Sequence, residues 1–288
     1  QSEPIIDISG FSRCVVRGLT LRNAGAGVRV RNSIGSVIER CVIGPVDQGI
    51  MLGEGADRTT VRFNEMFWNP YGEGRSKQEG AWEHWLANKK SGYADKHGIV
   101  LSRCAGGHEI HDNWIHDHWD GISVTPAGCG LSSNLDIHHN RITTLVDDGI
   151  ETGGPQKNCR YHDNLLEGCL VGLRIKTPDE GPFYIYRNLF FDNREDIRNF
   201  GEKDRTGGAF NPATGVWESA VVADGASVPQ PAAGYIYHNT VTANPAYSSN
   251  KVRGTGVPNY HYFNNLFWSE RWFQNVPKDD PSIDPNWK

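Results

Sequence analysis

Short runs of alternating apolar and polar residues recur along this chain at a regular spacing. Nine runs can be aligned, each rich in β-branched and aromatic side chains: VVRGLTL (15–21), VIERCVI (37–43), VRFNEMF (61–67), IHDNWIH (110–116), IHHNRIT (137–143), YHDNLLE (161–167), IYRNLFF (185–191), IYHNTVT (236–242) and YFNNLFW (262–268). From the third run onward they share an asparagine, at Asn64, Asn113, Asn140, Asn164, Asn188, Asn239 and Asn265. Strand-like runs that recur about every 24 residues, with no helical period between them, predict a solenoid of strands.

We therefore expect an all-β fold, a parallel β-helix of about ten coils in a single domain over residues 1–288. The shared asparagine is expected at a corner of each coil, where it bonds to its equivalents above and below and tolerates the left-handed backbone of the bend. Two intervals are about twice the others, which predicts insertions at about 68–95 and 194–233. The first is expected to contain a short helix, and the second reads as a long loop.

A second repeated strand lies between these runs and is centred on a glycine. Its copies are AGVRV (26–30), QGIML (48–52), HGIVL (97–101), DGISV (120–124), DGIET (148–152) and VGLRI (171–175). Period-two alternation turns the aliphatic residues after the glycine inward, so the alternate positions face outward. Stacking then brings together a charged and aromatic group of His97, Trp119, Asp120, Asp147, Asp148, Glu151, Arg174 and Lys176, within about 10–15 Å.

Composition narrows the function. The net charge of −5 argues against a nucleic-acid partner. No run is long enough to predict a membrane span, and the chain opens at residues 5–8 in a strand-like pattern, as a trimmed terminus would. The 33 glycines and 9 tryptophans suit a secreted protein, extracellular or periplasmic, that handles a polysaccharide or oligosaccharide.

Histidines at 111, 138 and 162, continued by Tyr186 and Tyr237, predict an aromatic stack rather than a zinc site, and no metal site is predicted.

Three long segments resemble the right-handed parallel β-helix proteins, namely IHDNWIHDHWDGISV, IHHNRITTLVDDGIETGG and YHDNLLEGCLVGLRIKTPDEGPFYIYRN. That group includes polysaccharide lyases, glycoside hydrolases, uronan epimerases and phage tailspikes. Within it, WDG (119–121), DDG (147–149) and RIKT (174–177) are similar to motifs of the polygalacturonase-type glycoside hydrolases. The resemblance implies that Asp120, Asp147 and Asp148 are the acid and base carboxylates, and that Arg174 and Lys176 bind substrate. The chain departs from that pattern by lacking the Gly-His-Gly coil.

The leading hypothesis is an extracellular or periplasmic glycoside hydrolase that needs no cofactor. One protonated carboxyl would donate to the leaving oxygen while a second activates water or attacks the sugar. Asp148 is the expected acid, with Asp147 and Asp120 as the base and its partner, and Glu151 takes over if Asp148 is buried. Arg174 and Lys176 would hold an anionic group of the substrate. The other expected substrate contacts are His97, Trp119, Trp82 and Trp85, with the tryptophans stacking on sugar rings.

Two alternatives remain open from the sequence. In a calcium-dependent polysaccharide lyase or uronan epimerase, Asp147, Asp148 and Glu151 would chelate calcium, and Lys176 or Arg174 would abstract the C5 proton. In a non-catalytic glycan-binding or structural solenoid, such as an adhesin or a tailspike segment, the same surface would only bind. The reaction product distinguishes the lyase from the hydrolase. A lyase product gains an ultraviolet-absorbing double bond, whereas a hydrolase product gains reducing ends without that absorbance.

Overall fold

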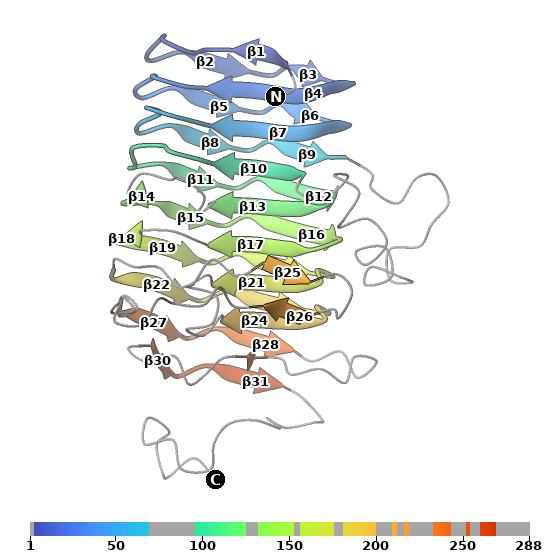
Figure 1. The fold of residues 1–288 in the computed structure, drawn as a ribbon, viewed down its shortest axis with the longest axis vertical. Helices are drawn as coiled ribbons and strands as arrows, with labels where there is room; N and C mark the ends of the chain where they lie inside the picture. The colour runs from blue at the N-terminus through green and yellow to red at the C-terminus, as the bar shows by residue number, and fades with distance from the viewer. Residues whose placement is uncertain are drawn as a thin grey trace.

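The computed structural model describes residues 3–68, 96–124, 132–152, 156–175, 181–199, 209–211, 216–218, 233–242, 252–253 and 260–268. In this part of the chain, three sheets of nine parallel strands each extend along a stack of coils (Figure 1). The coils follow one another from the blue N-terminal end at the top of Figure 1 downward. The expected right-handed parallel β-helix is confirmed.

Each coil contributes one strand to each sheet. Sheet A contains β1 (Pro4–Asp7), β4 (Ala24–Val30), β7 (Val46–Leu52), β10 (His97–Leu101), β13 (Asp120–Val124), β17 (Asp148–Thr152), β21 (Val171–Ile175), β24 (Glu195–Asn199) and β29 (Val252–Arg253). Sheet B contains β2 (Val15–Arg17), β5 (Val37–Glu39), β8 (Thr60–Arg62), β11 (Glu109–His111), β15 (Asp136–His138), β19 (Cys159–His162), β22 (Phe183–Tyr186), β27 (Gly234–Tyr237) and β30 (Tyr260–Phe263). Sheet C contains β3 (Thr20–Leu21), β6 (Val42–Ile43), β9 (Glu65–Phe67), β12 (Trp114–His118), β16 (Arg141–Leu145), β20 (Leu165–Glu167), β23 (Leu189–Phe191), β28 (Thr240–Thr242) and β31 (Leu266–Trp268).

Two details of the architecture differ from expectation. The described residues give nine strands per sheet rather than about ten coils. The predicted loop over 194–233 begins with a strand of the solenoid, because β24 pairs with β21 and buries Ile197. It also contains the antiparallel pair β25 (Ala209–Asn211) and β26 (Val216–Glu218). The helix predicted within 68–95 lies outside the described residues, apart from Trp68.

The core lies inside the coils and is built from the inward positions of all three sheets. Residues such as Ile99, Leu101 and Ile122 of sheet A, Ile110 of sheet B and Ile115 of sheet C are fully buried there. Neighbouring strands pair in register, so that Ile99 lies between Ile50 and Ile122 in the stack. The alternation predicted for sheet A is therefore confirmed. No helix in the described part of the chain has the length and apolar character required to cross a bilayer.

The asparagines form a continuous ladder at the corner between sheets B and C. The side-chain oxygen of Asn140 accepts hydrogen bonds from the backbone N–H and the side-chain amide of Asn113, at 3.2 and 3.0 Å. Asn164 accepts the same pair of bonds from Asn140. The left-handed backbone does not fall on these asparagines, as expected from the sequence, but on the residue before each, such as His139 and Asp163 (φ 54°). The preceding residue makes the bend, and the asparagine bonds nearby backbone groups, as Asn140 does with the carbonyls of Ile110 and His138.

We expect Asn140→Ala to lower the free energy of unfolding by roughly 3 kcal/mol or more, because two buried donors of Asn113 lose their acceptor. The Ile110 carbonyl also loses its bond from the Asn140 amide. Urea denaturation of the purified chain measures the change. Lys157→Ala, at an exposed position, should change it by less than about 0.5 kcal/mol. Equal, small effects of both substitutions would show that the ladder does not stabilise the fold.

A second ladder, of glycines, runs along sheet A. A Cβ added to Gly49, Gly121 or Gly149 would lie 2.2, 2.3 or 2.5 Å from the carbonyl oxygen of the glycine in the next coil. Real Cβ atoms do not approach so closely, so these positions exclude any side chain. The glycines therefore fix the close contact between coils beneath the outward residues of sheet A.

The expected aromatic stack runs along the outer face of sheet B. His111, His138, His162, Tyr186 and Tyr237 follow one another with ring centroids 4.6–5.1 Å apart and interplanar angles of 4–9°. Phe263 continues it at 4.9 Å from Tyr237. Tyrosine can therefore replace histidine along this face because either ring stacks on the rings of the neighbouring coils.

Candidate active site

The predicted site residues gather at four consecutive strands of sheet A, namely β10, β13, β17 and β21. The register places Asp120 opposite His97, and Glu151 between Ser123 and Arg174. Parallel strands lie about 4.8 Å apart, so residues in matching positions of neighbouring coils come into contact. This is the physical reason that sequence positions more than twenty residues apart share one site.

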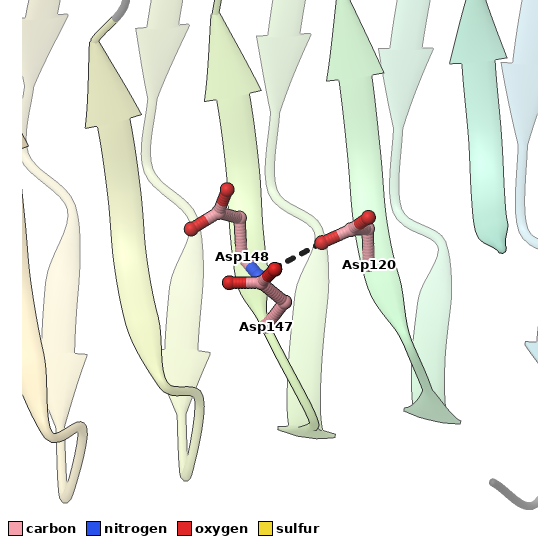
Figure 2. A group of neighbouring side chains, drawn as sticks. All are labelled: Asp120, Asp147 and Asp148. Atoms are coloured by element: carbon pink, nitrogen blue, oxygen red, sulfur yellow. Dashed lines mark hydrogen bonds between the residues drawn. The ribbon is translucent and has the colours of Figure 1, made fainter. Parts of the chain in front are cut away.

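Three carboxylates form the centre of the site (Figure 2). Asp120, Asp147 and Asp148 each place an oxygen within 4.8 Å of the other two. Asp120 starts β13, Asp148 starts β17, and Asp147 immediately precedes β17. The backbone N–H of Asp148 donates a 2.9 Å hydrogen bond to Oδ1 of Asp120, drawn as the dashed line in Figure 2. This bond fixes the orientation of the Asp120 carboxylate relative to the next coil.

Arg174 lies beside this cluster and holds two of the acids. Its Nη1 donates to Oδ2 of Asp148 at 2.9 Å and lies 3.7 Å from Oε1 of Glu151. The other oxygen of Glu151 accepts a 2.9 Å hydrogen bond from the Ser123 hydroxyl. Oδ1 of Asp148 is buried without a hydrogen-bond partner among the described residues. Asp148 therefore keeps one oxygen available for a proton or a ligand.

Burial sets the electrostatics of the site. Burial raises the pKa of Asp148 from 3.8 to about 7, and the charges of Asp147 and Glu151 add to this while Arg174 opposes it. Burial disfavours the charged guanidinium of Arg174, but the negative charges of Asp148, Asp147 and Glu151 outweigh it and raise the pKa of Arg174. Arg174 thus stays charged, and Asp148 exchanges a proton near neutral pH.

His97 contacts the cluster from the coil before Asp120. Its Nε2 lies 3.5 Å from Oδ2 of Asp120, and its Nδ1 lies 3.1 Å from Oε1 of Gln48. The His97 backbone N–H also donates to Oε1 of Gln48, at 3.2 Å. Since an amide oxygen only accepts, Gln48 orients the imidazole with Nε2 towards Asp120. The sequence prediction of the site did not include Gln48 or Ser123. In the repeated strand, Gln48 aligns with His97 and Ser123 aligns with Glu151.

Trp119 does not take the predicted role. Its side chain is fully buried in a small cluster with Val146, Leu170 and Val171, against which Trp68 packs, so its ring is covered and cannot stack on a sugar as placed. The alternation correctly turns Trp119 away from the main core, yet other apolar side chains cover it on the outer side. Lys176, Trp82 and Trp85 lie outside the described residues, and their roles stay predictions.

The structure meets the condition under which Glu151 was expected to act as the acid, because Asp148 is 1% exposed. Glu151 is also buried, at 8% exposed, and it contacts Ser123 and Arg174. The assignment of the acid to either residue stays a prediction. The triple of acids that could hold a cation contains Asp120 rather than Glu151, which changes the ligand set of the calcium alternative.

Comparisons with known proteins agree with this fold. Two solved structures of the periplasmic alginate epimerase AlgG, one of them a double mutant, align with TM-scores of 0.59 and 0.60 at 13% identity. The alignments cover 88% of this chain and about half of the epimerase, 50% and 51%. A search of the curated proteins finds no match. A model of the family described as "Periplasmic copper-binding protein (NosD)" matches residues 13–211. The family description confirms the expected location outside the cytoplasm, in the periplasm.

Proposed function

The chain belongs to the NosD family of periplasmic β-helix proteins, and from that premise we propose that it is a carbohydrate-active enzyme of the periplasm. The reaction we propose is hydrolysis of a glycosidic bond by the carboxylates of sheet A. One observation carries the proposal: three carboxylates lie within 4.8 Å of one another, and burial raises the pKa of one of them, Asp148, to about 7. Glycoside hydrolysis requires one carboxyl group that carries a proton and a second that is ionised, and a cluster with one raised pKa can supply both.

In this mechanism Asp148 donates its proton to the leaving oxygen. Its pKa of about 7 keeps a proton available near neutral pH, and Oδ1 is not engaged by another described hydrogen bond. Asp120, fixed by the Asp148 backbone N–H, and Asp147 supply the carboxylate that activates water or attacks the anomeric carbon. Arg174 steadies Asp148 and Glu151 and gives the site one positive charge for an anionic substrate.

A uronan epimerase is the second candidate, favoured by the likeness of fold to an alginate epimerase and by the buried guanidinium of Arg174. That cation would neutralise a uronate carboxylate while a carboxylate near pKa 7 removes the C5 proton. Epimerisation leaves the chain length unchanged, whereas hydrolysis shortens it. A non-catalytic glycan-binding solenoid would do neither.

Copper, which the family description names, does not fit the carboxylate cluster. In the described part of the chain, the three-ligand group is Asp120, Asp147 and Asp148, and all its donors are carboxylate oxygens. Such donors suit calcium, magnesium or manganese, while copper prefers imidazole or sulfur. Burial raises the pKa of the Cys159 thiol to about 11 and raises that of Cys169, so neither presents a thiolate. The proposed reaction therefore includes no copper step.

The test is incubation of the purified protein with a panel of neutral and anionic polysaccharides. We expect new reducing ends without ultraviolet absorbance, and Asp147→Asn, Asp148→Asn and Asp120→Asn should each lower the rate by at least about 100-fold. Glu109→Gln, which changes an exposed carboxylate on sheet B, serves as the matched control and should leave the rate unchanged. A chelator should have no effect.

Four other results would contradict the proposed hydrolysis or its site. Activity that survives both Asp147→Asn and Asp148→Asn shows that the site is wrong. Ultraviolet absorbance with loss of activity in chelator indicates a lyase, and a changed uronate composition by NMR at constant chain length indicates the epimerase. Binding of a polysaccharide with no product of any kind would contradict the enzyme hypothesis altogether.

A further inference from the structure

A column of arginines begins directly after the acids on sheet A. Glu151 of β17 pairs in register with Arg174 of β21. Arg174 pairs with Arg198 of β24, which in turn pairs with Arg253 of β29. In the three strands before β17 the same register position is uncharged, with Ser123 in β13, Val100 in β10 and Met51 in β7. Near the acids, the positive residues of this column therefore lie on the C-terminal side alone.

Arg198 is the more exposed of the two arginines nearest the acids. The Arg174 side chain is 8% exposed and contacts Asp148 and Glu151, whereas the Arg198 side chain is 17% exposed. Two coil spacings of about 4.8 Å separate Arg198 from Glu151. Burial raises the pKa of Asp148, and the charges of Arg174 and Arg198 oppose this shift. Arg198 is thus near enough to the acids to contact a sugar that they act on, or the next sugar along.

Glu195 holds the Arg198 guanidinium by one edge. Nε of Arg198 donates a 2.6 Å hydrogen bond to Oε2 of Glu195, and Nη2 donates to Oε1. Glu195 is 4% exposed, so this pair fixes the plane of the guanidinium. Further N–H donors remain on Nη1 and on the outer side of Nη2, and no acceptor among the described residues bonds Nη1. The Nη1–Nη2 edge is therefore oriented in advance for an oxyanion, which it can bind through two parallel hydrogen bonds.

We propose that the Nη1–Nη2 edge of Arg198 binds an oxyanion of the substrate, a uronate carboxylate or a sulfate, on a sugar that flanks the scissile bond. This inference rests on the proposed hydrolysis and adds a second subsite to it. Because Arg198 follows the acids along the stack of coils, the polysaccharide crosses the strands of sheet A along the solenoid axis. Arg198 and Glu195 form a neutral pair, so directed hydrogen bonds rather than excess charge select the oxyanion.

The experiment compares anionic oligosaccharides with uncharged forms of the same backbone. The probes are oligogalacturonate and oligomannuronate, each beside its methyl ester, and a sulfated oligogalactan beside its desulfated form. Calorimetry uses the Asp148→Asn variant, which should not turn the probes over. We expect at least one anionic probe to bind about tenfold or more tightly than its uncharged form, and the pair that shows this identifies the oxyanion. Arg198→Gln should abolish the preference and, with Asp148 intact, raise KM about tenfold while kcat changes by less than about threefold.

The matched control is Arg187→Gln. Arg187 also binds a carboxylate through Nε and Nη2, that of Asp163, and it lies next to sheet B rather than sheet A. Its replacement changes the net charge equally and should leave the preference and KM unchanged. Arg198→Lys keeps a positive partner for Glu195 but lacks the planar fork, so it should recover only part of the preference. Urea denaturation checks that each variant is folded.

Equal affinity for every anionic probe and its uncharged form overturns the subsite, and so does a preference that survives both Arg198→Gln and Arg198→Lys. These results are distinct from failure of the proposed hydrolysis, in which no probe gains reducing ends. Binding that depends on Arg198 without any product would support the subsite and contradict the hydrolysis. Hydrolysis of an uncharged probe with the same KM as its anionic form would support the hydrolysis and overturn the subsite.

Discussion

Asp148→Asn is expected to lower the hydrolysis rate by at least about 100-fold, since it removes the proton donor and leaves the shape of the side chain unchanged. The amide of the variant occupies the same buried volume as the carboxyl group, and Arg174 keeps its contact with Glu151 at 3.7 Å. Binding of substrate should change far less than the rate. Initial rates of reducing-end formation at saturating polysaccharide measure the loss, and an affinity measurement on the same variant checks binding.

The same substitution should make the protein more stable at alkaline pH. The pKa of Asp148 is about 7 in the folded protein, against 3.8 for an aspartate without these interactions. A raised folded pKa contributes stability that is complete below 3.8 and is lost as the pH rises through about 7. Asparagine cannot ionise, so the variant escapes this loss. Relative to wild type, the free energy of unfolding should rise between pH 4 and pH 8 by roughly 1–4 kcal/mol.

A control of opposite sign comes from sheet B. Hydrogen bonds from Arg187 hold the pKa of Asp163 well below its usual range, so Asp163→Asn should lose stability relative to wild type as the pH rises from acid to neutral. Urea denaturation of both variants across this pH range gives the two slopes. A flat difference for Asp148→Asn would mean that Asp148 is already ionised in the fold. Activity within tenfold of wild type would remove it from the mechanism.

The fold could be predicted because the same packing requirement recurs in every coil. Inward aliphatics, corner asparagines and close-contact glycines each leave a repeated letter in the sequence, and the structure confirms all three. The strand β24 escaped the prediction because Asp196 occupies the position that is glycine in the six strands from β4 to β21 of sheet A. Its side chain accepts a hydrogen bond from Asn193 instead. A prediction based on the repeated glycine therefore placed this strand in a loop.

The site was harder to predict because alternation states only which side of a strand a residue faces. It correctly brought the acids and Arg174 together, since their register follows from the repeat. It did not reveal that Trp119 is covered by apolar neighbours, which depends on how outer side chains pack on one another. Gln48 was missed because the repeat shows only that it aligns with His97, whereas the bonds of its side-chain oxygen to the backbone N–H and Nδ1 of His97 depend on how the side chain is oriented.

Gly121→Ala should be the most damaging substitution for the fold beneath the site. Its Cβ would lie 2.3 Å from the Gly149 carbonyl oxygen and 2.8 Å from Cγ2 of Ile142. A backbone oxygen in a paired strand cannot move alone, so β13 and β17 must separate. We expect a loss of about 3–5 kcal/mol in the free energy of unfolding. The strand pair that opens is the one that carries Asp120 and Asp148, so activity should fall with it.

Gly53→Ala separates this effect from the general cost of replacing a glycine. At Gly53 the added Cβ would meet the flexible Arg31 side chain at 3.0 Å, and the nearest backbone atom is 3.5 Å away. Arg31 can shift, so the loss there should stay below about 1 kcal/mol. Urea denaturation gives the stabilities, and amide hydrogen exchange shows whether protection is lost first in β13 and β17. If both alanines cost the same, close contact between coils is not what keeps glycine along sheet A, and the Asp120–Asp148 hydrogen bond does not depend on it.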